Sequence, residues 1–392
     1  MPLLAVRPQC WQSTGSGGAG GRGQGLALGT DGEGNGAGGW DGWGSSPILT
    51  ALLLAFQLTM ADLPTSLLPA RGPDPGIGVG TWAWGNQFLW GYDPAQDAGL
   101  QATFRRAVEL GLCFFDTADS YGTGRWNGRS ETLLGEWAAG LSPEQRGSLT
   151  VATKLAPFPW RLGRRGFARA FQTSRNRLQG QLQRVQLHWS TARYAPWQEG
   201  PLLDGLADLV LAGEVAELGL SNVGPRRLRA LHRRLAARGV PITSLQVQFS
   251  LLAPQPLEPG GVLEVCRELG IALLAYSPLA LGLLGRSPQQ SSASMPPGPR
   301  GVLFRRLEPG LVPLREALAR IGAPHGAPPA AVALNWCRAH GAMPIPGLRT
   351  TRQAEVAAGA LAWGLSEEER AELDRLALAL PRRMPANPFQ SD

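Results

Sequence analysis

Residues 77–85 read IGVGTWAWG, and the choice between two parallel-sheet folds turns on them. The first half is a short apolar strand pattern, and it runs directly into two tryptophans. An open doubly wound sheet that binds a dinucleotide would carry Gly-x-Gly-x-x-Gly directly after its first strand. Residues 77–85 lack that spacing. An open sheet is therefore the second interpretation, and a closed parallel barrel is the first.

Strand and helix patterns alternate along the chain from this first strand onward. The expected strands are 77–80, 112–116, 149–154, 182–188, 215–221, 244–250, 271–276 and 343–346. Helix patterns lie near 97–110, 129–140, 166–178, 199–212, 224–238, 260–270, 311–322, 328–340, 352–362 and 366–379. Eight strands that alternate with helices over about 300 residues predict an α/β fold, the (β/α)8 TIM barrel.

The barrel is expected to occupy residues 76–380, between an N-terminal extension (1–75) and a short tail (381–392). Residues 14–46 are low-complexity, glycine-rich sequence that is typical of a flexible segment. The apolar run 48–60 is shorter than the ~20 residues that span a bilayer, so we expect no integral membrane segment. This run suits a late signal, an anchor, or a gene model that begins upstream of Met60.

Composition excludes several classes of protein. The chain of 392 residues is 43% hydrophobic and 17% charged, which excludes a disordered chain. Its four cysteines are too scattered for a disulfide scaffold or a metal site, and they favour a reducing compartment. His232, His325 and His340 have no paired spacing either. We therefore expect no metal.

The net charge of +7 favours anionic partners, such as nucleic acid, acidic membranes or phosphate-bearing cofactors, without choosing among them. Six arginines crowd the helix pattern at 224–238, but no aromatic residues are interleaved with them. Such a cluster is more typical of a solvated helix face than of a nucleic-acid interface. We therefore expect no nucleic acid as a partner.

Lys154 is the only lysine in the chain, beside 36 arginines. A surface charge tolerates either residue, but a site that needs a compact ammonium does not accept a planar guanidinium. Lys154 is therefore a candidate for chemistry. The alternative, that it is a remnant without a special role, is equally compatible with the count.

Polar residues stand at the ends of most of the predicted strands, where a (β/α)8 barrel places its chemistry. In chain order they are Asp116, Tyr121 in the loop that follows it, Lys154, His188, Ser221, Asn222, Gln246 and Tyr276. One polar strand end is usually only the end of a strand. Several around one ring predict a shared pocket.

Four of these residues together predict a proton-donating catalytic group: Asp116, Tyr121, Lys154 and His188. A buried Asp116–Lys154 pair would keep the lysine charged, and the ammonium would lower the pKa of Tyr121 from about 10 toward the working pH. His188 could hydrogen-bond the oxygen that the phenol addresses. Such a group could protonate a carbonyl oxygen while a hydride arrives at the carbon.

The sequence resembles the aldo-keto reductases, and most closely the plastid and cyanobacterial branch similar to pyridoxal reductases. The likeness spans about residues 76–380 and rests on several motifs in order. They are Gly-Thr-Trp82-Ala-Trp84-Gly, Asp116-Thr-Ala-Asp-Ser-Tyr121-Gly, Val-Ala-Thr-Lys154, Val-Gln-Leu-His188-Trp, Gly-Leu-Ser221-Asn222, Gln246, Ala-Tyr276-Ser277-Pro278-Leu279 and Pro-Ile-Pro-Gly347.

The resemblance implies NADPH-dependent reduction of an aldehyde or ketone to an alcohol. Tyr121 would donate the proton, supported by Asp116, Lys154 and His188. Ser221, Asn222 and Gln246 would hold the nicotinamide carboxamide, and Tyr276 would stack on its ring. The remaining cofactor residues would be Ser277 and Leu279 at the pyrophosphate, then Gly347, Arg349, Arg352 and Gln353 at the adenosine 2′-phosphate. Arginine suits that phosphate.

The substrate is expected to be a small carbonyl compound, in a pocket lined by Trp82, Trp84, Trp126 and Trp189 and shaped by the segment 280–310. Two departures from the family keep a second hypothesis open, a cofactor-binding regulatory or interaction subunit with little turnover. Ala357 stands where the family often has asparagine, and the stretch before His188 is one residue short. The resemblance suggests a chloroplast location, with the cytoplasm as the alternative, and leaves the oligomeric state open.

Overall fold

The computed structural model describes residues 76–286 and 295–391. The expectations for residues 1–75 lie outside this described part. Within it, no helix is long and apolar enough to cross a membrane.

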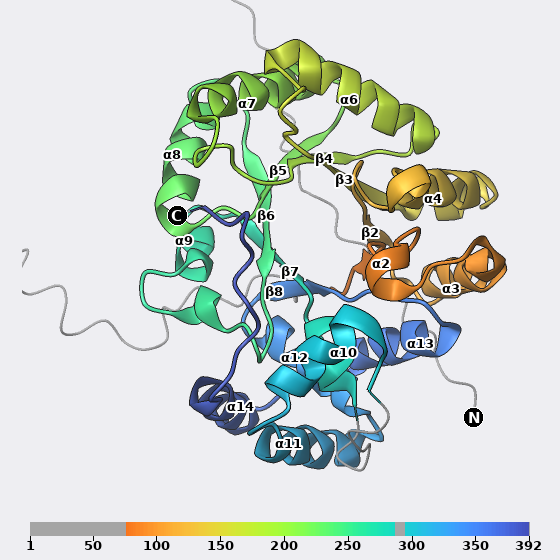
Figure 1. Cartoon of the computed structure of the whole chain (residues 1–392), viewed down its shortest axis with the longest axis vertical. Coiled ribbons are helices and arrows are strands. Elements are labelled where there is room, and N and C mark those ends of the chain that lie inside the picture. The colour runs from red at the N-terminus through yellow and green to blue at the C-terminus, as the bar shows by residue number, and fades with distance from the viewer. Residues whose placement is uncertain (1–75, 287–294, 392) are drawn as a thin grey trace, which may run out of the picture. The chain divides into compact units, whose positions relative to one another are not determined.

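Eight parallel strands form one sheet, and each strand pairs with the next in sequence order (Figure 1). The strands are β1 Val79–Gly80, β2 Phe114–Asp116, β3 Thr150–Leu155, β4 Arg184–Leu187, β5 Glu217–Ser221, β6 Ile242–Gln248, β7 Ala272–Tyr276 and β8 Ala342–Ile345. All eight predicted strands are confirmed, with ends that differ by a few residues.

Backbone hydrogen bonds between the first and last strands close the sheet into a barrel. The N–H of Gly78 donates to the carbonyl of Pro344 at 3.0 Å, and the N–H of Gly80 donates to Pro346 at 2.9 Å. A Cβ on Gly78 would lie 2.6 Å from Cδ1 of Phe114 and would overlap that ring. The closure therefore depends on glycine at this position, and the (β/α)8 prediction is confirmed.

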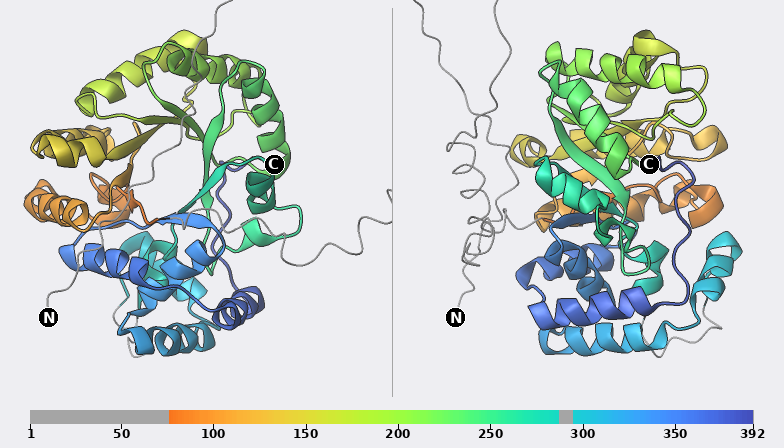
Figure 2. Two further views of the ribbon diagram at one scale, coloured as in Figure 1. Left: turned by 180° about the vertical axis from the view of Figure 1, so that it is seen from behind. Right: turned by 90° about the vertical axis from the view of Figure 1, so that its left-hand side faces the viewer.

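Helices surround the sheet, as the two views in Figure 2 show. Ten of them follow the predicted patterns: α3 Asp97–Glu109, α4 Arg129–Ala139, α6 Gly163–Arg177, α7 Pro196–Leu211, α8 Pro225–Ala236, α9 Val262–Glu268, α11 Val312–Gly322, α12 Pro329–Ala339, α13 Thr351–Gly359 and α14 Glu367–Ala379. Among the described residues, three further α-helices were not predicted: α2 Gln87–Trp90, α5 Pro143–Ser148 and α10 Gly298–Leu307.

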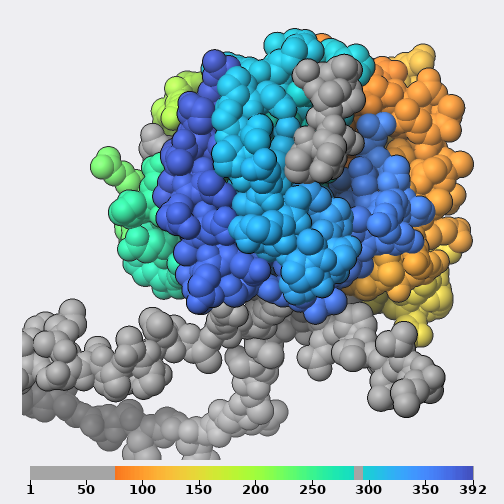
Figure 3. Space-filling view, turned by 90° about the horizontal axis from the view of Figure 1, so that it is seen from below, coloured from red at the N-terminus to blue at the C-terminus, as the bar shows by residue number. Residues whose placement is uncertain are grey.

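The first and last parts of the barrel lie next to each other on the outside as well. Helix α13 packs against α3, and Figure 3 shows the blue surface of the last helices beside the orange surface of the first elements. The barrel is thus closed in its helical layer and in its sheet.

The arginines of α8 lie on its outer face, as predicted. Leu228, Leu231 and Leu235 on the same helix are buried. Arg234 and Arg229 form ion pairs with Asp204 of α7 and Glu268 of α9, respectively. These charges therefore link neighbouring helices at the surface.

The tail after α14 runs back across the mouth of the barrel (Figures 1 and 2). The N–H of Met384 donates to the carbonyl of Leu252 at 2.8 Å. Near the end of the chain, Ser391 forms a parallel bridge with Val223, just beyond β5. The tail is thus fixed at both ends over the carboxyl ends of the strands.

Candidate active site

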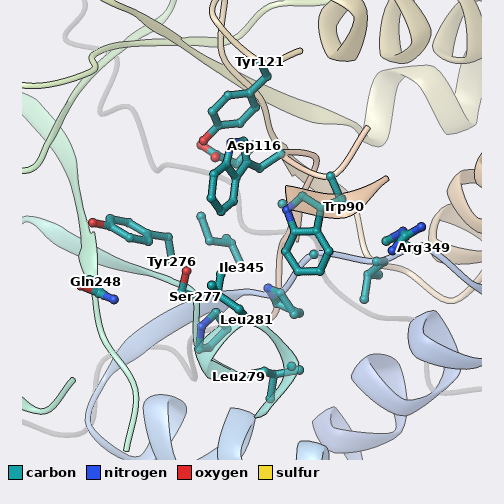
Figure 4. Close-up of a pocket in the computed structure, with 18 of the residues that line it drawn as sticks. Trp90, Asp116, Tyr121, Gln248, Tyr276, Ser277, Leu279, Leu281, Ile345 and Arg349 are labelled. Carbon is teal, nitrogen blue, oxygen red and sulfur yellow. The ribbon is translucent and has the colours of Figure 1, made fainter. Parts of the chain in front are cut away.

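A cavity of about 1310 Å³ opens at the carboxyl ends of the strands. Figure 4 shows Tyr121 and Asp116 together on one side of it, Tyr276 and Gln248 on another, and Trp90 beside Arg349. Its volume exceeds that of a pocket for a single drug-sized ligand. The cavity can therefore hold a dinucleotide together with a small substrate.

Asp116 and Lys154 form a buried ion pair at the base of the cavity, with side chains that are 2% and 1% exposed. The Lys154 ammonium also donates to the carbonyl of Thr117 at 2.7 Å. The second carboxylate oxygen of Asp116 accepts hydrogen bonds from Gln246 at 2.7 Å and Gln186 at 3.1 Å. The pair is therefore fixed on several sides, as a buried charge requires.

Tyr121 stands over this pair, with its ring centroid 4.7 Å from the Lys154 ammonium. The loop that carries it is tightly folded, because the N–H of Gly128 donates to the Tyr121 carbonyl at 2.9 Å. The next residue, Gly122, has φ +121°, and a Cβ there would lie 1.8 Å from the carbonyl oxygen of Trp126. Glycine at this position lets the loop present Tyr121 to the cavity.

The pKa of Tyr121 corrects one expectation. Burial raises it well above its ordinary value of 10.0, and the carboxylates of Asp116 and Asp119 raise it further. The predicted lowering by Lys154 does not prevail, because desolvation of the phenolate is the largest effect. Burial also lowers the pKa of Lys154, against the pull of Asp116. The phenol is therefore protonated at neutral pH.

His188 faces the cavity beside the phenol, so the short stretch before it does not move it out of the site. The two ring centroids are 5.9 Å apart in an edge-to-face arrangement. Nδ1 of His188 lies 3.3 Å from the hydroxyl of Ser120. Burial and the charge of Lys154 hold the pKa of His188 well below 6.5. The imidazole is therefore neutral and can donate one hydrogen bond.

Ser221, Asn222 and Gln246 all line the cavity. The Asn222 amide donates to the carbonyl of His188 at 2.9 Å and to the Ser221 hydroxyl at 3.1 Å. The Tyr276 hydroxyl donates to the oxygen of the same amide at 2.9 Å. Burial raises the pKa of Tyr276 to about 12. These four residues, from β5, β6 and β7, lie in one polar wall.

The predicted phosphate-binding residues lie along the other end of the same cavity. They are Ser277, Leu279, Gly347, Arg349, Arg352 and Gln353. Arg349 is partly buried, and its guanidinium lies 5.9 Å from the Trp90 ring centroid. The side chain of Arg352 is 78% exposed and pairs with Glu355 at 3.6 Å. The two arginines are therefore not equivalent, and Arg349 is the better placed.

Arg300 and the tail line the cavity beside Trp90, and neither Arg300 nor the tail was predicted as part of the site. The guanidinium of Arg300 lies 4.5 Å from the Trp90 ring centroid, and its Nε is buried without a hydrogen-bond partner. Burial lowers the pKa of Arg300, and the nearby positive charge of Arg349 lowers it further. Two arginines that share one indole form a positive site. No sequence pattern of α10 indicated it, since Arg300 reaches the cavity only through the tertiary fold.

The four predicted tryptophans divide into two groups. Trp82 and Trp189 line the cavity. Trp84 does not, since it is fully buried in the core and its indole N–H donates to the carbonyl of Leu348 at 2.9 Å. Trp126 does not line it either, and packs edge-to-face against Tyr92. Both rings therefore pack with the hydrophobic core: Trp84 lies within it, and Trp126 packs against it.

Two further observations complete the site. Ala357 of α13 is buried and lines the cavity, where it leaves more space than asparagine would. In the described residues, no three His, Cys, Asp or Glu side chains lie close enough to hold a metal ion.

The sequence and the structure of this chain were compared with those of known proteins. A model of the Aldo/keto reductase family matches residues 76–378. Chloroplastic pyridoxal reductase from Arabidopsis thaliana is 48% identical over 80% of this chain and 86% of its own length. An aldo-keto reductase from Klebsiella pneumoniae in complex with NADPH has a TM-score of 0.61 at 28% identity, over 81% of this chain and 94% of its own. A structure from the same organism with NADP and acetate gives 0.61 at 26% identity, over 81% and 95%.

Proposed function

Because the chain belongs to the aldo/keto reductase family, we propose that it reduces an aldehyde or ketone to an alcohol and that Tyr121 donates the proton. The cofactor is NADPH or NADP, which similar structures contain. One observation carries the proposal. A protonated phenol stands at the cavity between a buried Asp116–Lys154 pair and a neutral His188.

The residues of the cavity fit the cofactor. Bound NADPH supplies a hydride to the substrate carbon. At one end of the cavity, the Ser221 hydroxyl can donate to a carboxamide oxygen and the Gln246 amide oxygen can accept from its N–H. At the other end, Arg349 and Arg300 form no ion pair among the described residues and suit a phosphate.

Proton transfer is assigned to Tyr121 and its neighbours. The phenol holds its proton at neutral pH and can release it to a carbonyl oxygen as that oxygen gains negative charge. The Lys154 ammonium then stabilises the phenolate that is left, and Asp116 holds the ammonium in place. Neutral His188 can donate a second hydrogen bond to the same oxygen.

We further infer that the substrate is an aromatic aldehyde and that the protein acts in the plastid. Two observations support this inference. The relative from Arabidopsis thaliana is named a chloroplastic pyridoxal reductase, and pyridoxal is an aromatic aldehyde. The indoles of Trp82 and Trp189 and the ring of Phe389 line the cavity, where they can stack on a flat ring.

The decisive experiment replaces Tyr121 by phenylalanine and follows NADPH consumption with pyridoxal and other aldehydes. Because general acid catalysis is worth ~10²–10⁴-fold, we expect a loss of that size while NADPH still binds. Tyr92→Phe is the matched control, since Tyr92 is buried and its hydroxyl contacts Asp97 away from the cavity. Wild type that binds NADPH but reduces no carbonyl compound would support a regulatory role instead.

A further inference from the structure

The last residues of the chain belong to the wall of the active-site cavity. Residues 384–389 line it together with Tyr121 and Tyr276, and the tail crosses the barrel mouth to reach it (Figures 1 and 2). No role was predicted for this segment. Its position raises the question of what its side chains do there, and Asn387 makes the most specific contacts.

Asn387 closes a triangle of hydrogen bonds with two residues of the proposed cofactor site. Its side-chain N–H groups donate to the Asn222 amide oxygen at 2.9 Å and to the Tyr276 hydroxyl oxygen at 2.7 Å. The Tyr276 hydroxyl in turn donates to the same Asn222 oxygen at 2.9 Å. The chain thus joins the ends of β5 and β7 through a residue from its far terminus.

The orientation of the Asn387 amide is fixed by its own segment. Its carbonyl oxygen accepts a hydrogen bond from the Phe389 N–H at 2.9 Å. The amide nitrogen must therefore face Asn222 and Tyr276, since oxygen and nitrogen lie on opposite sides of the group. Ser391 and Met384 anchor the backbone on either side through bonds to Asn222 and Leu252.

These bonds use the full capacity of the Asn222 side chain. A primary amide has two donors and two acceptor positions. Its N–H groups already donate to His188 and Ser221, and its oxygen already accepts from Tyr276 and Asn387. Four hydrogen bonds therefore hold the Asn222 amide in one orientation in this structure.

Beside Asn222, two groups remain available to a ligand, the Ser221 O–H and the Gln246 amide oxygen. The Ser221 hydroxyl accepts from Asn222, and its own O–H donates to no acceptor among the described residues. The Gln246 amide donates to Asp116, so its oxygen remains available. One donor and one acceptor side by side match the oxygen and the N–H of the nicotinamide carboxamide.

We propose that Asn387 is a positioning residue for the nicotinamide end of the cofactor. It holds Asn222 and Tyr276, and through Asn222 it directs the Ser221 hydroxyl into the cavity. This proposal rests on the proposed function, because it takes the dinucleotide as the ligand. It assigns a binding role to the C-terminal tail, which reaches a site built otherwise from strand ends.

The test compares Asn387→Ala and Asn387→Asp with wild type in direct binding titrations of NADPH, NADH and adenosine 2′,5′-bisphosphate. The Asp variant keeps the shape of the side chain and its bond from Phe389, but it has no N–H to donate. Gln390→Ala is the matched control, because the Gln390 side chain makes no hydrogen bond among the described residues and lies on the same tail.

We expect both Asn387 variants to weaken NADPH and NADH by the same factor, about three- to tenfold, which corresponds to the loss of one or two hydrogen bonds. Adenosine 2′,5′-bisphosphate lacks a nicotinamide, so its affinity should be unchanged. Gln390→Ala should bind all three ligands as wild type does. A general loosening of the fold would instead weaken the bisphosphate as well.

Three results would overturn the proposal: dinucleotide binding as in wild type, an equal loss for the bisphosphate, or tighter binding of NADPH, which would make the tail a competitor of the cofactor. The failure of the proposed function looks different, since it would appear in wild type as absent NADPH binding or absent carbonyl reduction. The two failures are therefore separate observations.

Discussion

At the scale of single residues, Lys154 connects a count in the sequence with a position in the structure. A chain with 36 arginines keeps one lysine, and that lysine is buried against Asp116 under the Tyr121 ring. The scarcity of lysine identified Lys154 as a candidate for chemistry. It could not reveal the third partner, the carbonyl of Thr117, because backbone groups leave no trace in composition.

Lys154→Arg should therefore cost turnover rather than folding. The larger, planar guanidinium does not fit the place of an ammonium whose side chain is 1% exposed, so it would displace the phenol of Tyr121. We expect a large fall in kcat with only a modest change in the melting temperature and in NADPH affinity. Steady-state kinetics, a thermal melt and a cofactor titration measure the three quantities. Unchanged kcat would show that the site needs only a positive charge.

The raised pKa of Tyr121 predicts a flat pH profile for carbonyl reduction. Reduction needs the protonated phenol, and burial keeps the proton on Tyr121 as the pH rises through 10.0. Neutral His188 does not titrate above pH 6.5. We therefore expect kcat/KM for reduction to stay constant from pH 7 upward until Lys154, whose pKa burial lowers, loses its charge. A fall centred near pH 8 that is absent in Tyr121→Phe would restore the idea that Lys154 lowers this pKa.

At the scale of elements, regular patterns were predictable and contacts that depend on the tertiary fold were not. Strands such as β3 and β6 were predicted from short, largely apolar or alternating segments. Lys154 and Gln246, near their carboxyl ends, were predicted to meet because parallel strands end at one edge. The prediction that Trp84 lines the substrate pocket was wrong, because the direction of a side chain in a loop has no such regular pattern. Trp82 lines the cavity, but the indole of Trp84, two residues further along the chain, is buried in the core.

The position of the tail and the Trp90–Arg300 contact were not predicted, although the segment 280–310, which contains α10, was expected to shape the pocket. Each acts through a partner far away in the chain, and none has a periodicity of its own that points to the mouth of the barrel. For the tail, the distance is 165 residues between Asn387 and Asn222. Sequence patterns report local conformational preferences. The positions of these segments depend instead on tertiary contacts with residues that are distant in the sequence.

Phe389 gives a test of the tail on the substrate side. Its ring stacks on Trp189 with centroids 4.6 Å apart, and both line the cavity. Phe389→Ala should raise KM for an aromatic aldehyde about three- to tenfold, since a stacked pair is worth ~0.5–1.5 kcal/mol. NADPH affinity should not change. An equal effect on a small aliphatic aldehyde would argue against ring stacking with the substrate.

At the scale of the whole molecule, barrel closure depends on the narrow seam between β1 and β8. Gly78→Ala should lower the melting temperature, because its Cβ would meet Phe114 and Ile345 at 2.6 and 2.8 Å. Overpacking of this kind typically costs ~1–3 kcal/mol. Gly99→Ala is the control, since Gly99 lies in α3 and an added Cβ there meets nothing within 4 Å. That variant should be as stable as wild type or slightly more so. An unchanged melting temperature for Gly78→Ala would mean that β1 and β8 can move apart at this position at little cost in folding free energy.

The burial of Lys154 also makes the chain a reporter of its own unfolding. Reagents that acylate primary amines have one side-chain target here, because no other lysine exists in the sequence. In the folded barrel that ε-amine lies at the base of the cavity with its side chain 1% exposed, so it should react much faster when the barrel opens. The rate at which one acyl group is added at this position, read by mass spectrometry of the fragment that carries it, would count opening events. A bound dinucleotide should slow that rate, which offers an assay for ligands that needs no known substrate.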